Sequence, residues 1–388
     1  MSKLFQLILT IVTIVSLVFV SFAGYIIWSA FQADATETIG DMPVEEAADE
    51  VRFDDDAISD GIDSDTSDVN GTGTETDLDS ATADDSLLTL LTAALAKPAF
   101  VVLTYHHIDP ELENNPITVT PERFDEHISI LQASEYEPVS YRELTRFLRI
   151  AEETRRLQSL DRRFTPAEDE WMRESIDFIN KLPNAGYHIT FDDGYQSFYQ
   201  YVFPRLRDEG IPSTFFVIVR SSFKESHTAP DWINYPHVTW EELRIIQRHP
   251  LFEVQSHTYS LHSYEPGNGD PIPSMTGRVY RRDLGRVETQ EEFETRIYQD
   301  MILSRSYLEN RLRPHVVSGL SYPYGAYNDY VIEQSKRAGL QYLFTNQPGL
   351  VTYETSALQI PRVNAGAPEI SATDLMNSID DLFFRRSF

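Results

Sequence analysis

Two adjacent carboxylates, Asp192 and Asp193, follow a short run of alternating apolar and polar residues and precede Gly194. Neighbouring residues of a regular strand point to opposite faces, so both acids serve one site only where the strand ends. Gly194 permits that ending, because glycine adopts turn conformations that other residues resist. The pattern predicts two acids at the C-terminal end of a strand, at the mouth of an α/β sheet. A surface Asp-Asp-Gly turn is the alternative interpretation.

Polar residues also follow three other predicted strands: His106-His107, His257 with His262, and Tyr322-Pro323-Tyr324. In a barrel of parallel strands, all of these ends share one face. A helix would place two histidines five positions apart on different faces, but a strand end and the loop after it can bring them to one ion. Two imidazoles and one carboxylate make a three-ligand divalent site with positions open to water, which is typical of catalytic sites. The alternative is that they are ordinary core or surface histidines.

A metal would explain why two acids are needed. A free Asp with a pKa of ~4 faces a gap of ~12 units, or about 16 kcal/mol, in deprotonating bulk water at ~15.7. Zinc lowers the pKa of water to ~7, which cuts the gap to ~3 units, or about 4 kcal/mol. One acid is then a ligand and its neighbour a base. A two-carboxylate glycosidase is the competing use, but it needs carboxyl groups about 5–9.5 Å apart, which adjacent positions supply poorly.

Strands and helices alternate from residue 100 to residue 382. Nearly continuous apolar strands predict a parallel sheet covered by helices, and about seven strands in roughly 290 residues favour a closed barrel over an open doubly wound sheet. Thr120, Thr239 and Asn328 are predicted helix caps. Residues 151–182 are interpreted as helices inserted on the outside, and residues 263–290 as one long loop.

Composition excludes several classes of protein. The 388-residue chain carries a formal net charge of −29, from 32 Lys and Arg against 61 Asp and Glu. That balance argues against nucleic acid as a partner, because phosphate binding needs a basic face. The chain has no cysteine, which excludes disulfides, thiolate metal sites and a cysteine nucleophile. Any metal must therefore be bound by His, Asp or Glu.

The first residues predict a membrane anchor. Residues 4–31 carry no charge and are mostly apolar. A helix of that length spans ~42 Å, more than the ~30 Å hydrocarbon core. Residues 1–33 are therefore predicted to cross the cell membrane once, with the rest of the chain outside the cell; a signal cleaved near Ala23 is the alternative. Residues 34–86 follow as a predicted disordered linker, rich in acids with Arg52 as the single base. Residues 87–388 are the predicted catalytic domain.

Several of these motifs resemble one known family. Thr190-Phe-Asp-Asp-Gly194, His257-Thr with His262, and Tyr322-Pro-Tyr-Gly325 are similar to the motifs of the NodB-homology polysaccharide deacetylases, carbohydrate esterase family 4. Tyr105-His106 and Ile360-Pro-Arg-Val363 resemble the branch that N-deacetylates poly-β-1,6-N-acetyl-D-glucosamine of biofilm matrix. The resemblance covers residues 99–368.

The resemblance implies a distorted (β/α)7-type barrel that binds one divalent ion, Zn in preference to Co, Ni or Fe. It implies removal of acetyl groups from N-acetylglucosamine units of an extracellular polysaccharide. A peptidoglycan or chitooligosaccharide N-deacetylase and a non-catalytic glycan-binding module are the alternatives. The roles it implies are Asp192 as base, His106 as general acid, the Tyr324 N–H at the oxyanion, Asp193, His257 and His262 as metal ligands, and Tyr259, Tyr322 and Pro323 as substrate-binding residues.

The sequence departs from the family pattern at two points. The wider family's Arg-x-Pro-Tyr motif has Ser321 in place of Arg, so the usual partner of the base is expected to be missing. No late catalytic histidine follows Tyr324, which gives His106 more importance. His107, its neighbour, is expected to be structural only.

Overall fold

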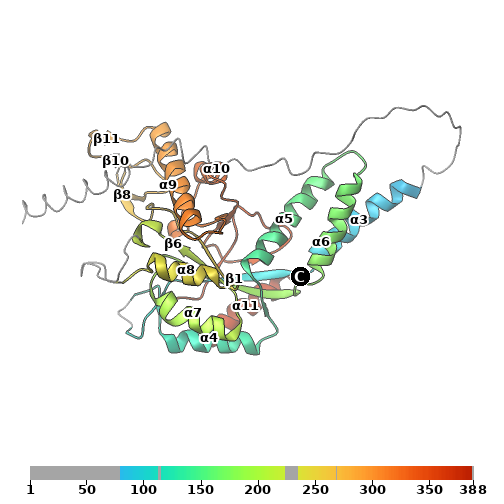
Figure 1. Ribbon diagram of the computed structural model, residues 1–388, viewed down its shortest axis with the longest axis horizontal. Helices are drawn as coiled ribbons and strands as arrows, with labels where there is room; N and C mark the ends of the chain where they lie inside the picture. Colours follow the sequence, from blue (N-terminus) through green and yellow to red (C-terminus); the bar gives the residue numbers. More distant parts are fainter. Residues whose placement is uncertain (1–78, 112–114, 223–234, 268, 387–388) are drawn as a thin grey trace, which may run out of the picture. The chain divides into compact units, whose positions relative to one another are not determined.

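The computed structural model describes residues 79–111, 115–222, 235–267 and 269–386 (Figure 1). The predicted membrane anchor, and the predicted linker up to residue 78, lie outside these ranges. None of the helices within them is long and apolar enough to cross a bilayer. The first described element, α3 (Asp79–Leu95), begins inside the predicted linker.

Apolar strands build one sheet in the order β13-β12-β7-β6-β5-β1-β14, with β4 and β15 attached to β5 and β1. Every pairing is parallel except that of β14 with β1. The C-terminal ends of the parallel strands therefore lie along one edge of the sheet. The strands are β1 (Ala99–Tyr105), β4 (Glu137–Pro138), β5 (Ala185–Phe191), β6 (Ser213–Val217), β7 (Phe252–Ser256), β12 (Gly319–Ser321), β13 (Tyr342–Phe344), β14 (Leu350–Val351) and β15 (Val363–Asn364).

The sheet is a curled half-barrel, so the predicted closed barrel is only partly right. In the described part of the chain, no full strand joins the two sheet edges, β13 and β1. A short segment bridges them instead: Ile360 pairs with Phe344 of β13, and Val363 and Asn364 pair with β1. We call residues 360–364 the seam segment. The distorted (β/α)7-type barrel that the resemblance implied is thus right in its parallel sheet, while the two residues of β15 are too few to produce a strand pattern in the sequence.

Helices and short turns cover the sheet. The predicted caps are confirmed: Thr120 and Asn328 accept backbone N–H bonds, and Thr239 forms a capping box with Glu242. The helices are α4 (Pro121–Ala133), α5 (Tyr141–Gln158), α6 (Pro166–Ile179), α7 (Phe203–Glu209), α8 (Trp240–Arg248), α9 (Gln290–Arg311), α10 (Asp329–Arg337) and α11 (Ala372–Arg386), with short turns η1 (Phe198–Val202), η2 (Val219–Ser222) and η3 (Pro323–Gly325).

Two stretches were predicted only coarsely. Residues 151–182 do form helices, α5 and α6, which lie beside α3 (Figure 1). Residues 263–290 are not one long loop, because they contain the hairpins β8 (Tyr264–Pro266) with β9 (Pro271–Pro273) and β10 (Tyr280–Arg281) with β11 (Arg286–Val287). Strands this short and rich in proline give no alternating pattern. A third small pair joins β2 (His107–Ile108) to β3 (Thr118–Val119).

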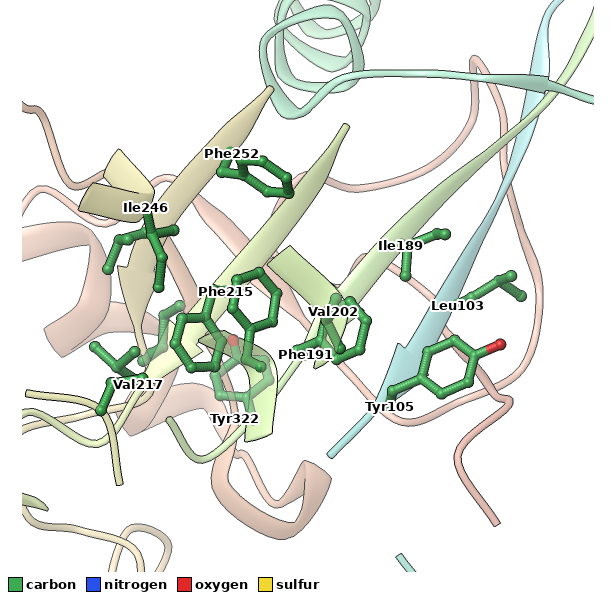
Figure 2. Close-up of a cluster of buried hydrophobic side chains, with 14 of the residues drawn as sticks. Leu103, Tyr105, Ile189, Phe191, Val202, Phe215, Val217, Ile246, Phe252 and Tyr322 are labelled. Carbon is green, nitrogen blue, oxygen red and sulfur yellow. The ribbon is translucent and has the colours of Figure 1, made fainter. Parts of the chain in front are cut away.

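The main core fixes the ends of β5 and β6. Aromatic side chains pack beneath them, and the rings of Phe198 and Phe215 stack with centroids 4.1 Å apart. Figure 2 shows Phe191 and Phe215 in this cluster with Tyr105 and Tyr322. Close packing of fully buried rings leaves little room for strand movement. The residues that follow these strands therefore start from fixed positions.

One buried histidine gives the fold a pH dependence. His188 of β5 contacts Val139 O through Nδ1, at 2.8 Å, and Thr214 Oγ1 through Nε2, at 2.9 Å. Burial lowers its pKa to about 4, although the bond to the Val139 carbonyl opposes the shift. The native state thus favours neutral imidazole, while the unfolded chain binds a proton near the ordinary value of 6.5.

We expect the free energy of unfolding to fall as the pH drops from 6.5 to 4, with up to about 3 kcal/mol of this loss due to His188. Urea denaturation at a series of pH values should show that the free energy of unfolding of His188→Gln depends less steeply on pH over that range. Above pH 7 the free energy of unfolding should depend on pH equally in wild type and variant, because His188 is neutral in both the folded and the unfolded state. The same pH dependence in wild type and variant below pH 6.5 would contradict the role assigned to His188.

A candidate metal centre beside a buried ion pair

Three of the predicted residues converge where their strands end. Asp193 follows β5, His257 follows β7, and His262 lies in the loop before β8. Asp193 Oδ1 is 3.3 Å from His257 Nε2 and 3.2 Å from His262 Nε2. All three predicted ligand atoms lie within 4.8 Å of one another. The structure therefore brings together the three predicted metal ligands.

The donor atoms fit a cation. Nδ1 of His257 lies 2.8 Å from the Ser321 carbonyl, which can only accept, so Nδ1 carries a proton and Nε2 faces Asp193. Burial would lower the pKa of His257, but Asp192 and Asp193 raise it, which favours a positive charge, a proton or a metal ion, at Nε2. Oδ1 of Asp193 is buried and has no hydrogen-bond partner among the described residues. Lone pairs that face one another at this range repel unless a positive charge lies between them. Two nitrogens and one carboxylate oxygen also form the donor set of three-ligand catalytic zinc sites.

Burial and neighbouring charge support the ligand states. Burial alone would raise the pKa of Asp193, but the nearby imidazoles, His257 foremost among them, hold that pKa well below its usual range. Burial, reinforced by His257, lowers the pKa of His262 to about 4. At neutral pH, Asp193 is therefore an anion and His262 a neutral base, the forms that bind metal.

Backbone strain is concentrated at this site. Asp193, Thr258 and Tyr324 have φ angles of 74°, 71° and 59°, and they are the non-glycine residues with positive φ in the described part of the chain. Each such residue costs on the order of 1–3 kcal/mol. In return, the left-handed turn after Asp192 directs Asp193 toward the histidines.

The second acid, Asp192, is bound by a guanidinium that the sequence did not assign to it. Arg362 is 1% exposed and donates to both carboxylate oxygens, from Nη1 to Oδ1 at 2.9 Å and from Nη2 to Oδ2 at 2.8 Å. Ser321 Oγ donates to Oδ2 at 2.9 Å. Burial would raise the pKa of Asp192, but Arg362 and the nearby histidines lower it to about 2.

The expectation that the base has lost its arginine partner is therefore wrong. Ser321 does stand in the motif position, but Arg362 of the seam segment supplies the charge, and Asn346 Oδ1 accepts from its Nη2 at 2.7 Å. Ile360-Pro-Arg-Val363 was singled out in the sequence, yet only the bridging of the two sheet edges reveals its contact. Asn346 gave no signal in the sequence.

His106 lies beside the two acids. It is half-buried, and its Nδ1 is buried without a hydrogen-bond partner in the described part of the chain. Burial lowers its pKa, while the charges of Asp193 and Asp192 oppose the shift. His107 instead contacts Ser197 Oγ at 3.0 Å. The two histidines therefore have different surroundings, and only His106 has a free buried nitrogen.

Tyrosines surround the centre in several ways. Tyr195, which sequence reasoning missed, is close enough to Asp193 that, after burial, the carboxylate further raises the pKa of its hydroxyl. Tyr324 is 41% exposed, and its ring lies 4.3 Å from that of His262. Tyr259 is half-buried and stacks on Tyr307 with centroids 5.6 Å apart.

Two predicted substrate-binding residues lie in the core instead. Tyr322 is 0% exposed, and its hydroxyl donates to Leu358 O at 3.1 Å. Pro323 is also buried. The structure therefore does not support the prediction that these two side chains bind substrate, because the turn after β12 directs them inward and exposes Tyr324 instead.

Comparison with known proteins agrees with this geometry. The model of the polysaccharide deacetylase family matches residues 180–343, a range that contains Asp192, Asp193, His257, His262 and Tyr324. This part of the chain is therefore similar to polysaccharide deacetylases. Arg362 lies beyond the end of the match.

Curated relatives of the deacetylase domain share a name. The poly-beta-1,6-N-acetyl-D-glucosamine N-deacetylase of Escherichia coli (strain K12) is 27% identical over 274 residues, covering 68% of this chain and 36% of that protein. The protein of the same name from Staphylococcus epidermidis is 29% identical over 184 residues, covering 47% of this chain and 55% of its own length. The chain thus spans about a third to a half of these relatives.

Solved structures share the fold of the deacetylase domain. A de-N-acetylase from Aggregatibacter actinomycetemcomitans superposes with a TM-score of 0.57 at 22% identity, covering 72% of this chain and 99% of that one. A deacetylase domain from Bordetella bronchiseptica gives 0.52 at 22% identity, covering 70% of this chain and 96% of that one.

Arg362→Met should lower the free energy of unfolding by about 3–5 kcal/mol, because it leaves the buried charge of Asp192 without its partner. Chemical denaturation of the purified domain measures the loss. Arg281→Met is the control: its ion pair with Asp283 is exposed, and its removal should cost less than about 1 kcal/mol. Equal losses in both variants would show that the buried pair has no special importance.

Proposed function

We propose that the protein is a metal-dependent N-deacetylase that removes acetyl groups from N-acetylglucosamine units of a polysaccharide, with poly-β-1,6-N-acetyl-D-glucosamine as its substrate. The observation that carries the proposal is the convergence of Asp193, His257 and His262 beside a separate, Arg-paired acid. The family match and the shared name of the curated relatives support the reaction and the substrate.

The residues divide the chemistry as follows. A divalent ion bound by Asp193, His257 and His262 would lower the pKa of water and polarise the amide carbonyl. Asp192, oriented by Arg362, takes a proton from the attacking water as the new C–O bond forms. The Tyr324 N–H donates to the carbonyl oxygen as negative charge develops there. His106 in its protonated form, which the charges of Asp193 and Asp192 favour, gives that proton to the amide nitrogen as the C–N bond breaks, so that acetate and a free amine leave.

Zinc is the proposed ion, because two imidazole nitrogens and one carboxylate oxygen suit it. The proposal also places the domain outside the cell, attached to the membrane by residues 1–33. The support for this location is the uncharged, mostly apolar run of residues 4–31.

Neighbouring isosteric variants separate binding from turnover. Asp193→Asn should lose zinc, because it removes a charged ligand, whereas Asp192→Asn should retain zinc and lose about 10²–10⁴-fold in rate as the base is removed. Metal content by mass spectrometry and a zinc affinity measurement check the first result, and acetate release checks the second. Zinc retention by Asp193→Asn at wild-type affinity would contradict the ligand assignment.

Substrate linkage is tested with paired oligomers. Acetate release from β-1,6-linked N-acetylglucosamine oligomers should exceed release from β-1,4-linked oligomers of the same length. A preference for β-1,4 linkage would instead indicate chitin or peptidoglycan. Binding of either oligomer by zinc-loaded protein without any acetate release would indicate a glycan-binding module.

A further inference from the structure

One face of α9 carries polar side chains into the interior. Arg296, Asp300 and Ser304 are spaced four residues apart, so they lie along one face of the helix. Asp300 and Ser304 are buried, with 6% and 0% exposure. Burying a carboxylate is costly unless its oxygens accept hydrogen bonds. We call these three residues the α9 polar stripe.

Asp300 holds the loop that carries His262. Its Oδ1 accepts from the Tyr259 N–H at 2.8 Å, and its Oδ2 accepts from the Ser260 N–H at 2.9 Å and from Ser260 Oγ at 3.3 Å. Both carboxylate oxygens thus bind consecutive backbone groups midway between His257 and His262. Burial raises the pKa of Asp300 to about 6, while the backbone bonds oppose the shift.

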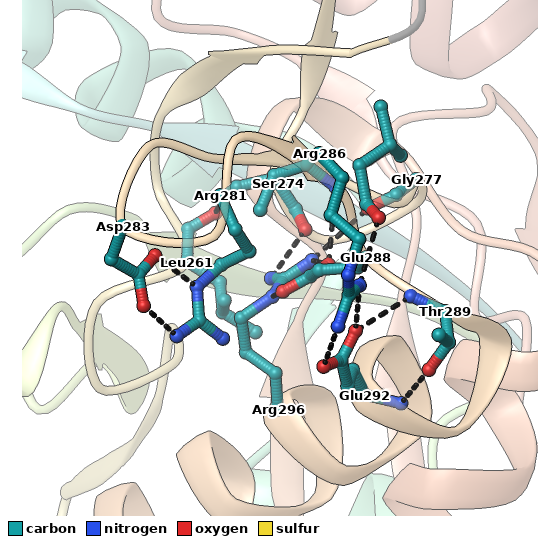
Figure 3. A network of polar contacts seen from close by, with 12 residues as sticks. Leu261, Ser274, Gly277, Arg281, Asp283, Arg286, Glu288, Thr289, Glu292 and Arg296 are labelled. Carbon is teal, nitrogen blue, oxygen red and sulfur yellow. Dashed lines mark hydrogen bonds and ion pairs between the residues drawn. The ribbon is translucent and has the colours of Figure 1, made fainter.

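The rest of the stripe holds both ends of the same loop. Ser304 Oγ lies 2.6 Å from Ser256 Oγ, immediately before His257. Arg296 donates to Ser274 O at 2.8 Å, and Ser274 Oγ donates to Leu261 O at 2.8 Å, immediately before His262. Figure 3 shows Arg296 between Ser274, Gly277 and Glu288. These hydrogen bonds therefore reach the loop from just before His257 to just before His262.

The loop needs these hydrogen bonds because its backbone is strained. Thr258 has a φ of 71°, a conformation that a β-branched residue strongly resists. Without external bonds the turn would relax, and Nε2 of His262 would leave its place 3.2 Å from Asp193 Oδ1. The α9 polar stripe touches neither the ligand atoms nor the reacting groups.

We propose that Asp300 is a positioning residue of the metal centre, which sets cation affinity by fixing the His257–His262 loop before the ion binds. The inference rests on the proposed function for the presence of an ion. Outer partners that orient ligands typically change metal affinity by about 10–100-fold when they are removed.

The test compares two carboxylates of the same helix. Asp300→Asn keeps the shape but turns an N–H donor toward one of the backbone N–H groups. Glu309→Gln is the matched control: Glu309 accepts from the Val317 N–H at 3.0 Å, outside the loop. Chelator competition should show zinc affinity weakened by about 10–100-fold in Asp300→Asn and within about threefold of wild type in Glu309→Gln. Melting temperatures of the metal-free proteins show whether stability alone differs.

Equal zinc affinity in the two variants would overturn the proposal. If Asp300→Asn does not fold, hydrogen exchange of the wild type tests the proposal instead. Hydrogen exchange of the metal-free protein should show the Tyr259 and Ser260 amides protected, and rapid exchange would refute a loop fixed in advance. If the wild type binds no zinc at all, the proposed function fails instead, while the amide protection still reports on the loop.

Discussion

The buried pair of Asp192 and Arg362 connects the seam segment to the middle of the sheet. The acid lies at the end of β5, in the middle of the sheet, and the guanidinium comes from the segment that links β13 to β1. A fully buried charge pair forms only when both partners are in place, because either charge alone would be strongly destabilising. The site is therefore complete only when the seam segment is in place. The same contact orients Asp192 and sets its protonation state.

The metal centre follows from the parallel sheet in a different way. The parallel strands β5 and β7 place Asp193 and His257 at one edge of the sheet. The third predicted ligand, His262, lies in a loop, which the sheet alone does not position. That loop requires bonds from α9 and a residue with positive φ. Strain at Asp193, Thr258 and Tyr324 is then compensated by packing and hydrogen bonding elsewhere, as is common at functional sites.

The sequence could predict whatever depends on short-range pattern. Apolar runs located the long strands, capping residues located α4, α8 and α10, and residue types at strand ends located Asp193, His257 and His262. Contacts between distant segments left no such trace. Arg362 lies 170 residues from Asp192, and its role depends on a two-residue strand with no periodicity. Tyr322 was predicted to bind substrate because it belongs to a functional motif, whereas the turn after β12 decides which side chains of that motif face inward.

The seam segment also bears on where this domain stops. The family match ends at residue 343, inside β13, but the chain continues to Arg362 before the central acid acquires its counter-charge. A protein truncated at residue 343 would keep all three predicted metal ligands. Its buried Asp192 carboxylate, however, would lack the charge of Arg362. The smallest autonomous unit of this fold therefore extends at least through Asn364, some twenty residues beyond the end of the family match.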